Sequence, residues 1–121
     1  MVLSSEIGGS GFIVLPEFGT MIFKDVNPQA KHPHFKTRDV AIFFFQLSPA
    51  WLRWRQTEGY FTTVEGEQIE PEKEKNARKF SLMDIERIAY SFYGHGIINI
   101  EKLTSTLRIL VLVGKGYGVI N

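Results

Sequence analysis

Residues Asp39–Leu47 read DVAIFFFQL, and this run gives the strongest strand signal in the chain. β-Branched and aromatic residues favour strands, and a run that is apolar on both faces is typical of a central strand covered on both sides. In a half-open sheet, one face of the same strand would instead present its aromatic rings to a ligand. Ser48-Pro49 follows and is expected to turn the chain.

The clearest helix signal lies further along the chain. Ser81 followed by Asp84 fits a helix N-cap with an acidic residue in the first turn. Apolar residues then recur at spacings of three and four, so we expect a helix over Leu82–Tyr93. Gly94 or Gly96 would end it.

Strand patterns on both sides of this helix set the expected fold class. Further strands are predicted at Phe12–Leu15, Thr20–Val26, Trp51–Gln56, Tyr60–Val64, Arg78–Phe80, Ile97–Leu103, Ser105–Val113 and Tyr117–Ile120. We therefore expect an α+β fold, built mainly of antiparallel sheets with one central helix. Its approximate order is four strands, the helix, then three strands.

Length and composition are those of an ordinary globular domain. The chain has 121 residues, of which 44% are hydrophobic and 22% charged, so we expect a single α+β domain over residues 1–121. Within it, residues 1–10 are expected to be a flexible segment, and residues 65–77 an exposed charged loop. Asn27–Arg38 is also expected to be a loop, because it is polar and contains two prolines.

Several classes of protein are excluded by composition. The chain contains no cysteine, which excludes disulfides, cysteine-based zinc sites and thiol catalysis. The first ten residues lack the pattern of a signal peptide, and the longest apolar runs, Val40–Phe45 and Ile109–Val113, are too short to span a bilayer. We expect a cytoplasmic protein, or an intracellular viral one, with no membrane partner.

The net charge is only +1, but its distribution is uneven. From Lys24 to Arg55, six Lys and Arg residues stand against two Asp, a local net charge of +4. Gln56–Asn76 has six Glu against two Lys, or −4, and Ala77–Asn121 has six basic against three acidic residues, or +3. Such segregation suits a polyanion partner, although an unevenly charged, solvated surface would give the same pattern.

The segment Trp51-Leu52-Arg53-Trp54-Arg55 combines rings with guanidinium groups. On a strand, alternation would put Trp51, Arg53 and Arg55 on one face. Unpaired bases could stack on such rings, at roughly 1–3 kcal/mol per base, while phosphates meet the cations. In the alternative interpretation, the rings belong to the core and the arginines cap a strand edge. The predicted nucleic-acid-binding residues are Lys24, Phe43, Phe45, Trp51, Arg53, Trp54, Arg55, Tyr60 and Lys79.

Other motifs give no catalytic, metal or cofactor site. His32-Pro33-His34 could offer two imidazoles, but no specific metal-binding pattern surrounds them. The glycines of Gly114–Gly118 are not followed by the helix that a phosphate loop needs. The acidic run Glu65–Glu74 lies in a polar stretch that contains a proline, which is typical of a solvated loop and not of a pair of catalytic carboxylates. We therefore expect no enzyme activity, no metal and no cofactor.

The stretch from Val40 to Ala89 resembles Whirly-type single-stranded-DNA-binding proteins. The similarity is carried by AIFFFQLSPAW, by the basic aromatic segment that follows, and by RKFSL leading into a helix with Asp84 and Ile85. It implies a repeated plan of sheet, helix, sheet, helix and binding of single-stranded DNA. The family's Lys-Gly-Lys-Ala strand is not recognisable here, and neither is its second helix, so the family's tetramer is not implied.

These observations give two functional expectations. The first is sequence-tolerant binding of single-stranded nucleic acid, with DNA favoured over RNA, by a protein that forms a homodimer. The alternative is a non-enzymatic structural or protein-interaction module that forms a homo-oligomer.

Overall fold

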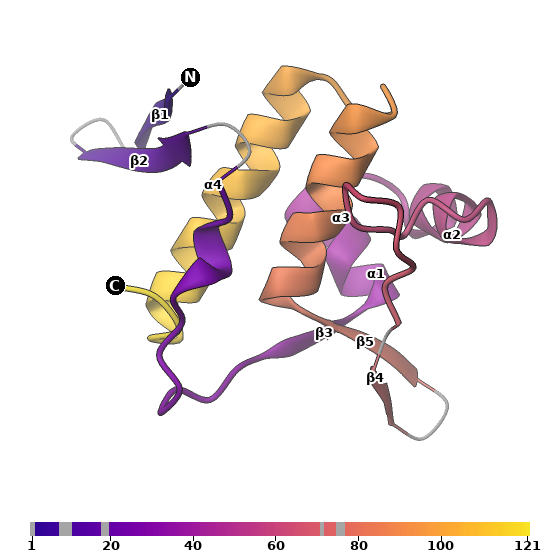
Figure 1. Cartoon of the computed structure of the whole chain (residues 1–121), viewed down its shortest axis with the longest axis horizontal. Coiled ribbons are helices and arrows are strands. Elements are labelled where there is room, and N and C mark those ends of the chain that lie inside the picture. Colours follow the sequence, from indigo (N-terminus) through magenta and orange to yellow (C-terminus); the bar gives the residue numbers. More distant parts are fainter. Residues whose placement is uncertain (1, 8–10, 18–19, 71, 75–76) are drawn as a thin grey trace.

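The computed structural model of the chain describes residues 2–7, 11–17, 20–70, 72–74 and 77–121. Helical elements make up most of its regular structure, and two small antiparallel sheets accompany them (Figure 1). In chain order the elements are β1 (Val2–Ile7), β2 (Gly11–Glu17), η1 (Ile22–Lys24), β3 (His34–Lys36), α1 (Thr37–Asp39), η2 (Val40–Phe45), α2 (Pro49–Thr57), β4 (Glu72–Glu74), β5 (Ala77–Ser81), α3 (Leu82–Gly94) and α4 (Ile100–Gly116).

The predicted fold, mainly antiparallel sheets around one central helix, is therefore wrong. One sheet is the β1–β2 hairpin, and the other has the order β3-β5-β4 with antiparallel neighbours. Strand β1 lies within the segment expected to be flexible, and β4 within the expected charged loop. The predicted strands Phe12–Leu15 and Arg78–Phe80 fall inside β2 and β5. The predicted strands Thr20–Val26, Tyr60–Val64 and Tyr117–Ile120 are not strands in the structure.

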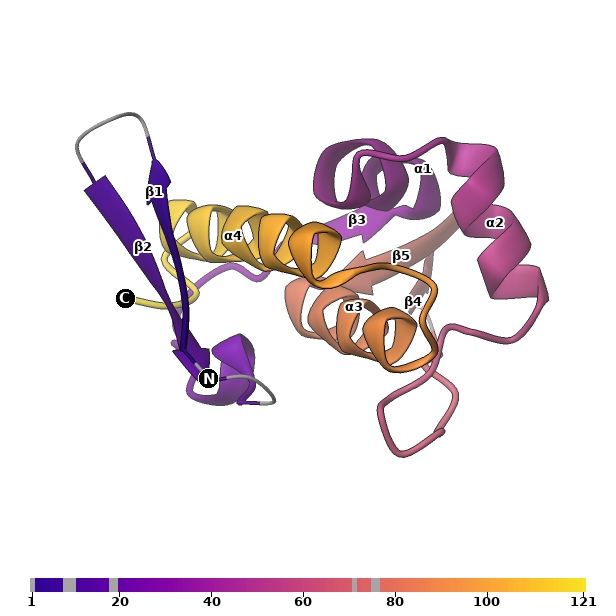
Figure 2. The same cartoon turned by 90° about the horizontal axis from the view of Figure 1, so that it is seen from above.

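Helices α3 and α4 lie side by side at the centre of the molecule (Figure 1). The β1–β2 hairpin lies beside α4, and α2 lies at the opposite end (Figure 2). The predicted helix Leu82–Tyr93 is confirmed as α3, and the Asp84 N–H donates to Ser81 Oγ at 3.2 Å. None of the helices in the described ranges is long and apolar enough to cross a membrane.

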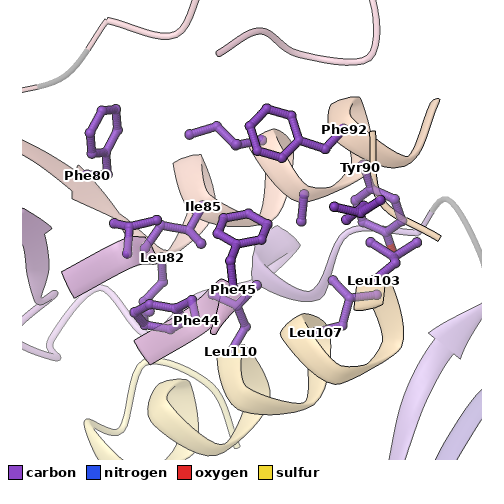
Figure 3. Packing of buried hydrophobic residues seen from close by; sticks show 14 of the residues in the cluster. Phe44, Phe45, Phe80, Leu82, Ile85, Tyr90, Phe92, Leu103, Leu107 and Leu110 are labelled. Carbon is purple, nitrogen blue, oxygen red and sulfur yellow. The ribbon is translucent and has the colours of Figure 1, made fainter. Parts of the chain in front are cut away.

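The run DVAIFFFQL forms the end of α1 and the π-helix η2 instead of a central strand. Its exposed apolar residues are Ile42 and Phe43, and its fully buried ones are Val40, Ala41, Phe44 and Phe45, a helical spacing. Figure 3 shows Phe44 and Phe45 between core side chains of α3 and of α4. A short apolar run can be buried as a helix or as a strand, so packing against α3 and α4 overrides strand propensity here.

Two further helices replace predicted strands because a capping residue precedes each. Ser48 Oγ accepts the Trp51 N–H at 3.2 Å, and Pro49 occupies the first turn of α2, where its missing N–H costs nothing. Asn99 Oδ1 accepts the Lys102 N–H at 2.8 Å at the start of α4. One stripe of α4 is buried: Leu103, Thr106, Leu107, Leu110, Val111 and Gly114. The strands predicted at 51–56, 97–103 and 105–113 are therefore wrong.

A buried carboxylate on α3 holds the segment before β3. Glu86 is fully buried, and its two oxygens accept the backbone N–H groups of Ile22 and Phe23, the latter at 3.1 Å. Burial raises the pKa of Glu86 to about 7, although the two N–H donors and neighbouring Arg87 favour the charged form. The side chain of Phe23 is buried in turn against Gly114 of α4.

We predict that the free energy of unfolding falls as pH rises from about 4.5 to about 7. Over this interval Glu86 stays protonated in the folded protein but ionises in the unfolded chain, where its pKa is lower, so rising pH favours the unfolded state. The free energy of unfolding should drop by up to about 3 kcal/mol over this interval. Urea denaturation at a series of pH values measures the slope. Glu86→Gln should lose that part of the slope, and an unchanged slope in this variant would show that another group causes it.

Candidate nucleic-acid interface

Helix α2 carries two differently exposed faces. Leu52 is fully buried, whereas Arg53 and Trp54 are exposed. The Thr57 hydroxyl donates to the Arg53 carbonyl oxygen at 2.9 Å, which satisfies an acceptor in the last turn. The N-cap at Ser48 and this bond together define a short helix whose outer side faces solvent.

A cleft of about 360 Å³ lies where α2, the start of α1 and β5 meet. We call it the basic cleft, and its described lining residues are Lys36, Thr37, Arg38, Arg53, Gln56, Thr57 and Arg78. Four of the seven are cations, and all four are exposed. Four separate elements, β3, α1, α2 and β5, therefore deliver positive charge to one concave surface.

Within the described residues, no carboxylate balances the charge of the basic cleft. No carboxylate is among its described lining residues, and its four cations form no ion pair with a carboxylate in the described part of the chain. Like charges gathered on a concave surface repel one another and raise the local concentration of anions. A phosphate or another polyanion would relieve that repulsion, and Thr37, Gln56 and Thr57 could add hydrogen bonds.

Arg55 faces away from the basic cleft and lies among aromatic rings. Its guanidinium carbon is 4.2 Å from the Trp54 ring centre, 5.2 Å from that of Trp51 and 6.0 Å from that of Tyr60. The buried Nε of Arg55 has no hydrogen-bond partner within the described residues, so the rings are its main contacts. Trp51 also packs edge-on against core Phe92, at 5.7 Å between ring centres. Arg55 and Trp51 are thus committed to internal packing.

The structure separates the residues that were predicted to share one face. Phe45 is fully buried, so the side chain that was predicted to contact a ligand is enclosed in the core. Lys24 lies on η1, at the other end of the molecule from α2 (Figures 1 and 2). Phe43 is exposed on η2, and Lys79 pairs with Lys36 across β3 and β5. The common sheet face expected for these residues does not exist.

Of the predicted residues, Arg53 alone lines the basic cleft, and exposed Trp54 follows it on α2. Lys36, Arg38 and Arg78 were missed as site residues. Their signal was present in the positive charge of the 24–55 segment and in the Arg78-Lys79 pair. Sequence alone did not show that the chain brings residues 36–38 and 78 beside α2.

Other candidate sites on the described surface are weaker. A cavity of about 590 Å³ is lined by Met21, Thr63, Val64, Glu65, Glu67, Arg87, Tyr90, Tyr93 and Gly94, and it shares no residue with the basic cleft. Its mixture of rings and dispersed charges forms no recognisable catalytic constellation. The His32 ring hydrogen-bonds the Asn27 carbonyl at 3.0 Å, and no group of three metal-ligating side chains occurs in the described ranges.

Comparison with known proteins gives a family but no activity. Searches of curated proteins and of solved structures found no match. The resemblance to Whirly-type proteins therefore stays a prediction, and the sheet-based plan that it implies differs from the fold described above. A family described as a domain of unknown function, DUF7229, matches residues 27–112, which include every described residue of the basic cleft. Because this match spans well over half of the chain, the protein belongs to the DUF7229 family.

Proposed function

We propose that this chain is a non-enzymatic nucleic-acid-binding protein that holds the sugar–phosphate backbone in the basic cleft. The observation that carries the proposal is the convergence of Lys36, Arg38, Arg53 and Arg78 on one concave surface without a carboxylate among its described lining residues. Lys and Arg supply the sequence-independent part of nucleic-acid affinity by releasing counterions from phosphates. The proposed binding is accordingly sequence-tolerant and sensitive to salt.

Single strands were the expected ligand because rings were expected on an open sheet face. Without that sheet, the support for stacking is reduced to exposed rings such as Phe43 and Trp54, which are 55% and 51% exposed. The proposal therefore keeps nucleic acid, and DNA before RNA, as the partner. It keeps the cytoplasm of a cell, or of a virus-infected cell, as the compartment, which a cysteine-free chain suits.

We predict that DNA affinity falls about 100-fold between about 50 and about 200 mM salt, as expected for four phosphate contacts. The double variant Arg38→Ala/Arg78→Ala should lower the slope of log affinity against log salt by about 2, since each contact contributes about 0.9. Fluorescence anisotropy with labelled single-stranded and duplex DNA measures both quantities.

The matched control is Lys31→Ala/Lys115→Ala, which removes the same charge from exposed residues outside the basic cleft. Its salt slope should equal that of the unaltered protein. If both double variants weaken binding equally, net charge and not the basic cleft is responsible. If neither form of DNA binds at low salt, the proposed function is lost.

A second role as a homo-oligomeric interaction module is favoured by two adjacent apolar residues on η2. Ile42 and Phe43 are 47% and 55% exposed, and exposed neighbouring apolar side chains commonly mark protein contacts. The proposed homodimer would bury this pair against its copy. Such a dimer is compatible with DNA binding because neither residue lines the basic cleft.

We predict a concentration-dependent dimer in sedimentation equilibrium, weakened at least about tenfold by Phe43→Ser, since burying a Phe side chain is worth roughly 1.5–3 kcal/mol. Leu112→Ser is the control, because Leu112 is 47% exposed on α4. It should leave the dimer unchanged. A chain that stays monomeric at all concentrations would remove this role without affecting the proposed DNA binding.

A further inference from the structure

Two consecutive helices near the basic cleft form a helix-turn-helix. Thr37–Phe45 is helical without a break, and α2 begins at Pro49, so three residues form the turn. Gln46 adopts a left-handed conformation, with φ of 54°, that ends the first helix. Ser48 then caps α2. Figures 1 and 2 show α2 running across the direction of η2 rather than alongside it, as in helix-turn-helix motifs.

The outer face of α2 is exposed to solvent along its whole length. Ala50, Arg53, Trp54 and Thr57 are all exposed, and they are spaced at i, i+3, i+4 and i+7, which is one face of a helix. An α-helix fits the DNA major groove, which is about 12 Å wide. Arg can bond guanine there, and Ala or Thr can contact a thymine methyl group.

The remaining cations of the basic cleft lie beside this face and not on it. Lys36 and Arg38 flank the start of the first helix, and Arg78 comes from β5, which pairs with β3. In helix-turn-helix complexes the first helix crosses the backbone while the second enters the groove. Cations at the first helix and at the neighbouring strand are therefore placed to contact phosphates along the edge of the groove.

We infer that α2 is a recognition helix that enters the major groove of duplex DNA, while Lys36, Arg38 and Arg78 hold the adjacent phosphates. This inference rests on the proposed function and makes it more specific. It favours duplex over single-stranded DNA because a protruding helix fits a groove. A stacking platform for unpaired bases would need several open rings, and here Trp51 and Tyr60 are half-buried around Arg55.

The test uses the full chain and a mixed-sequence duplex of about 20 base pairs, roughly two helical turns. Dimethyl sulfate methylates guanine N7 in the major groove and adenine N3 in the minor groove. Saturating protein should protect N7 and leave N3 reactive. By anisotropy at about 50 mM salt, the duplex should bind at least about tenfold more tightly than either of its separated strands.

Arg53→Ala should weaken duplex binding about 10- to 100-fold, because Arg53 lies at the centre of the inserted face. Lys115→Ala is the matched control, because Lys115 is exposed on α4 and does not line the basic cleft, and this variant should bind like the unaltered protein. Arg53→Gln is the second variant, and an unchanged urea midpoint shows that each variant is folded.

Unprotected N7 in the bound duplex would overturn the recognition-helix assignment, and so would equal or tighter binding of single strands. In both of those cases the basic cleft would still be a nucleic-acid site. Absence of binding to either form would instead refute the proposed function itself.

Discussion

The position of the basic cleft depends on the burial of Phe44 and Phe45 between α3 and α4 (Figure 3). Phe45 lies 5.5 Å from Phe92 between ring centres, and the Lys102 ammonium donates to the Phe45 carbonyl oxygen at 3.0 Å. The contact between the Phe45 and Phe92 rings fixes the rotation of η2 about its axis. The Lys102 ammonium satisfies a carbonyl oxygen at the C-terminal end of η2, and its positive charge also interacts favourably with the helix dipole there. Once this helix is fixed, a three-residue turn leaves α2 little freedom, and its polar side must face outward.

The elements that were predicted correctly carry their signal locally. The N-cap of Ser81 and the apolar stripe through Ile85 specify α3 without reference to any other part of the chain. Residues 39–47 carry no such signal, because an all-apolar run satisfies a buried helix as well as a buried strand. The caps at Ser48 and Asn99 are also local signals, and they indicate the helices at 49–57 and 100–116 against the β propensity of those residues.

The candidate site was harder to predict than the helices because it is assembled from distant segments. Positive charge in residues 24–55 was evident from the sequence, but charge distribution along a chain does not say which cations meet. Arg78 reaches the basic cleft because β5 pairs with β3 in the register that sets Phe35 opposite Phe80. A fully buried Phe80 fixes that register, so core packing places a surface cation beside Arg53.

The fate of Arg53 and Arg55 shows how one wrong element type alters a functional prediction. On a strand the two would share a face, whereas on a helix, at about 100° per residue, they point in nearly opposite directions. Arg55 accordingly packs among Trp51, Trp54 and Tyr60, where its charge meets ring faces and its Nε is shielded from water. Arg53 is left exposed and lines the basic cleft. The contacts between cation and ring that suggested base stacking belong to Arg55 and are largely internal. The cation that is available to a partner is Arg53, which has no cation–ring contact among the described residues.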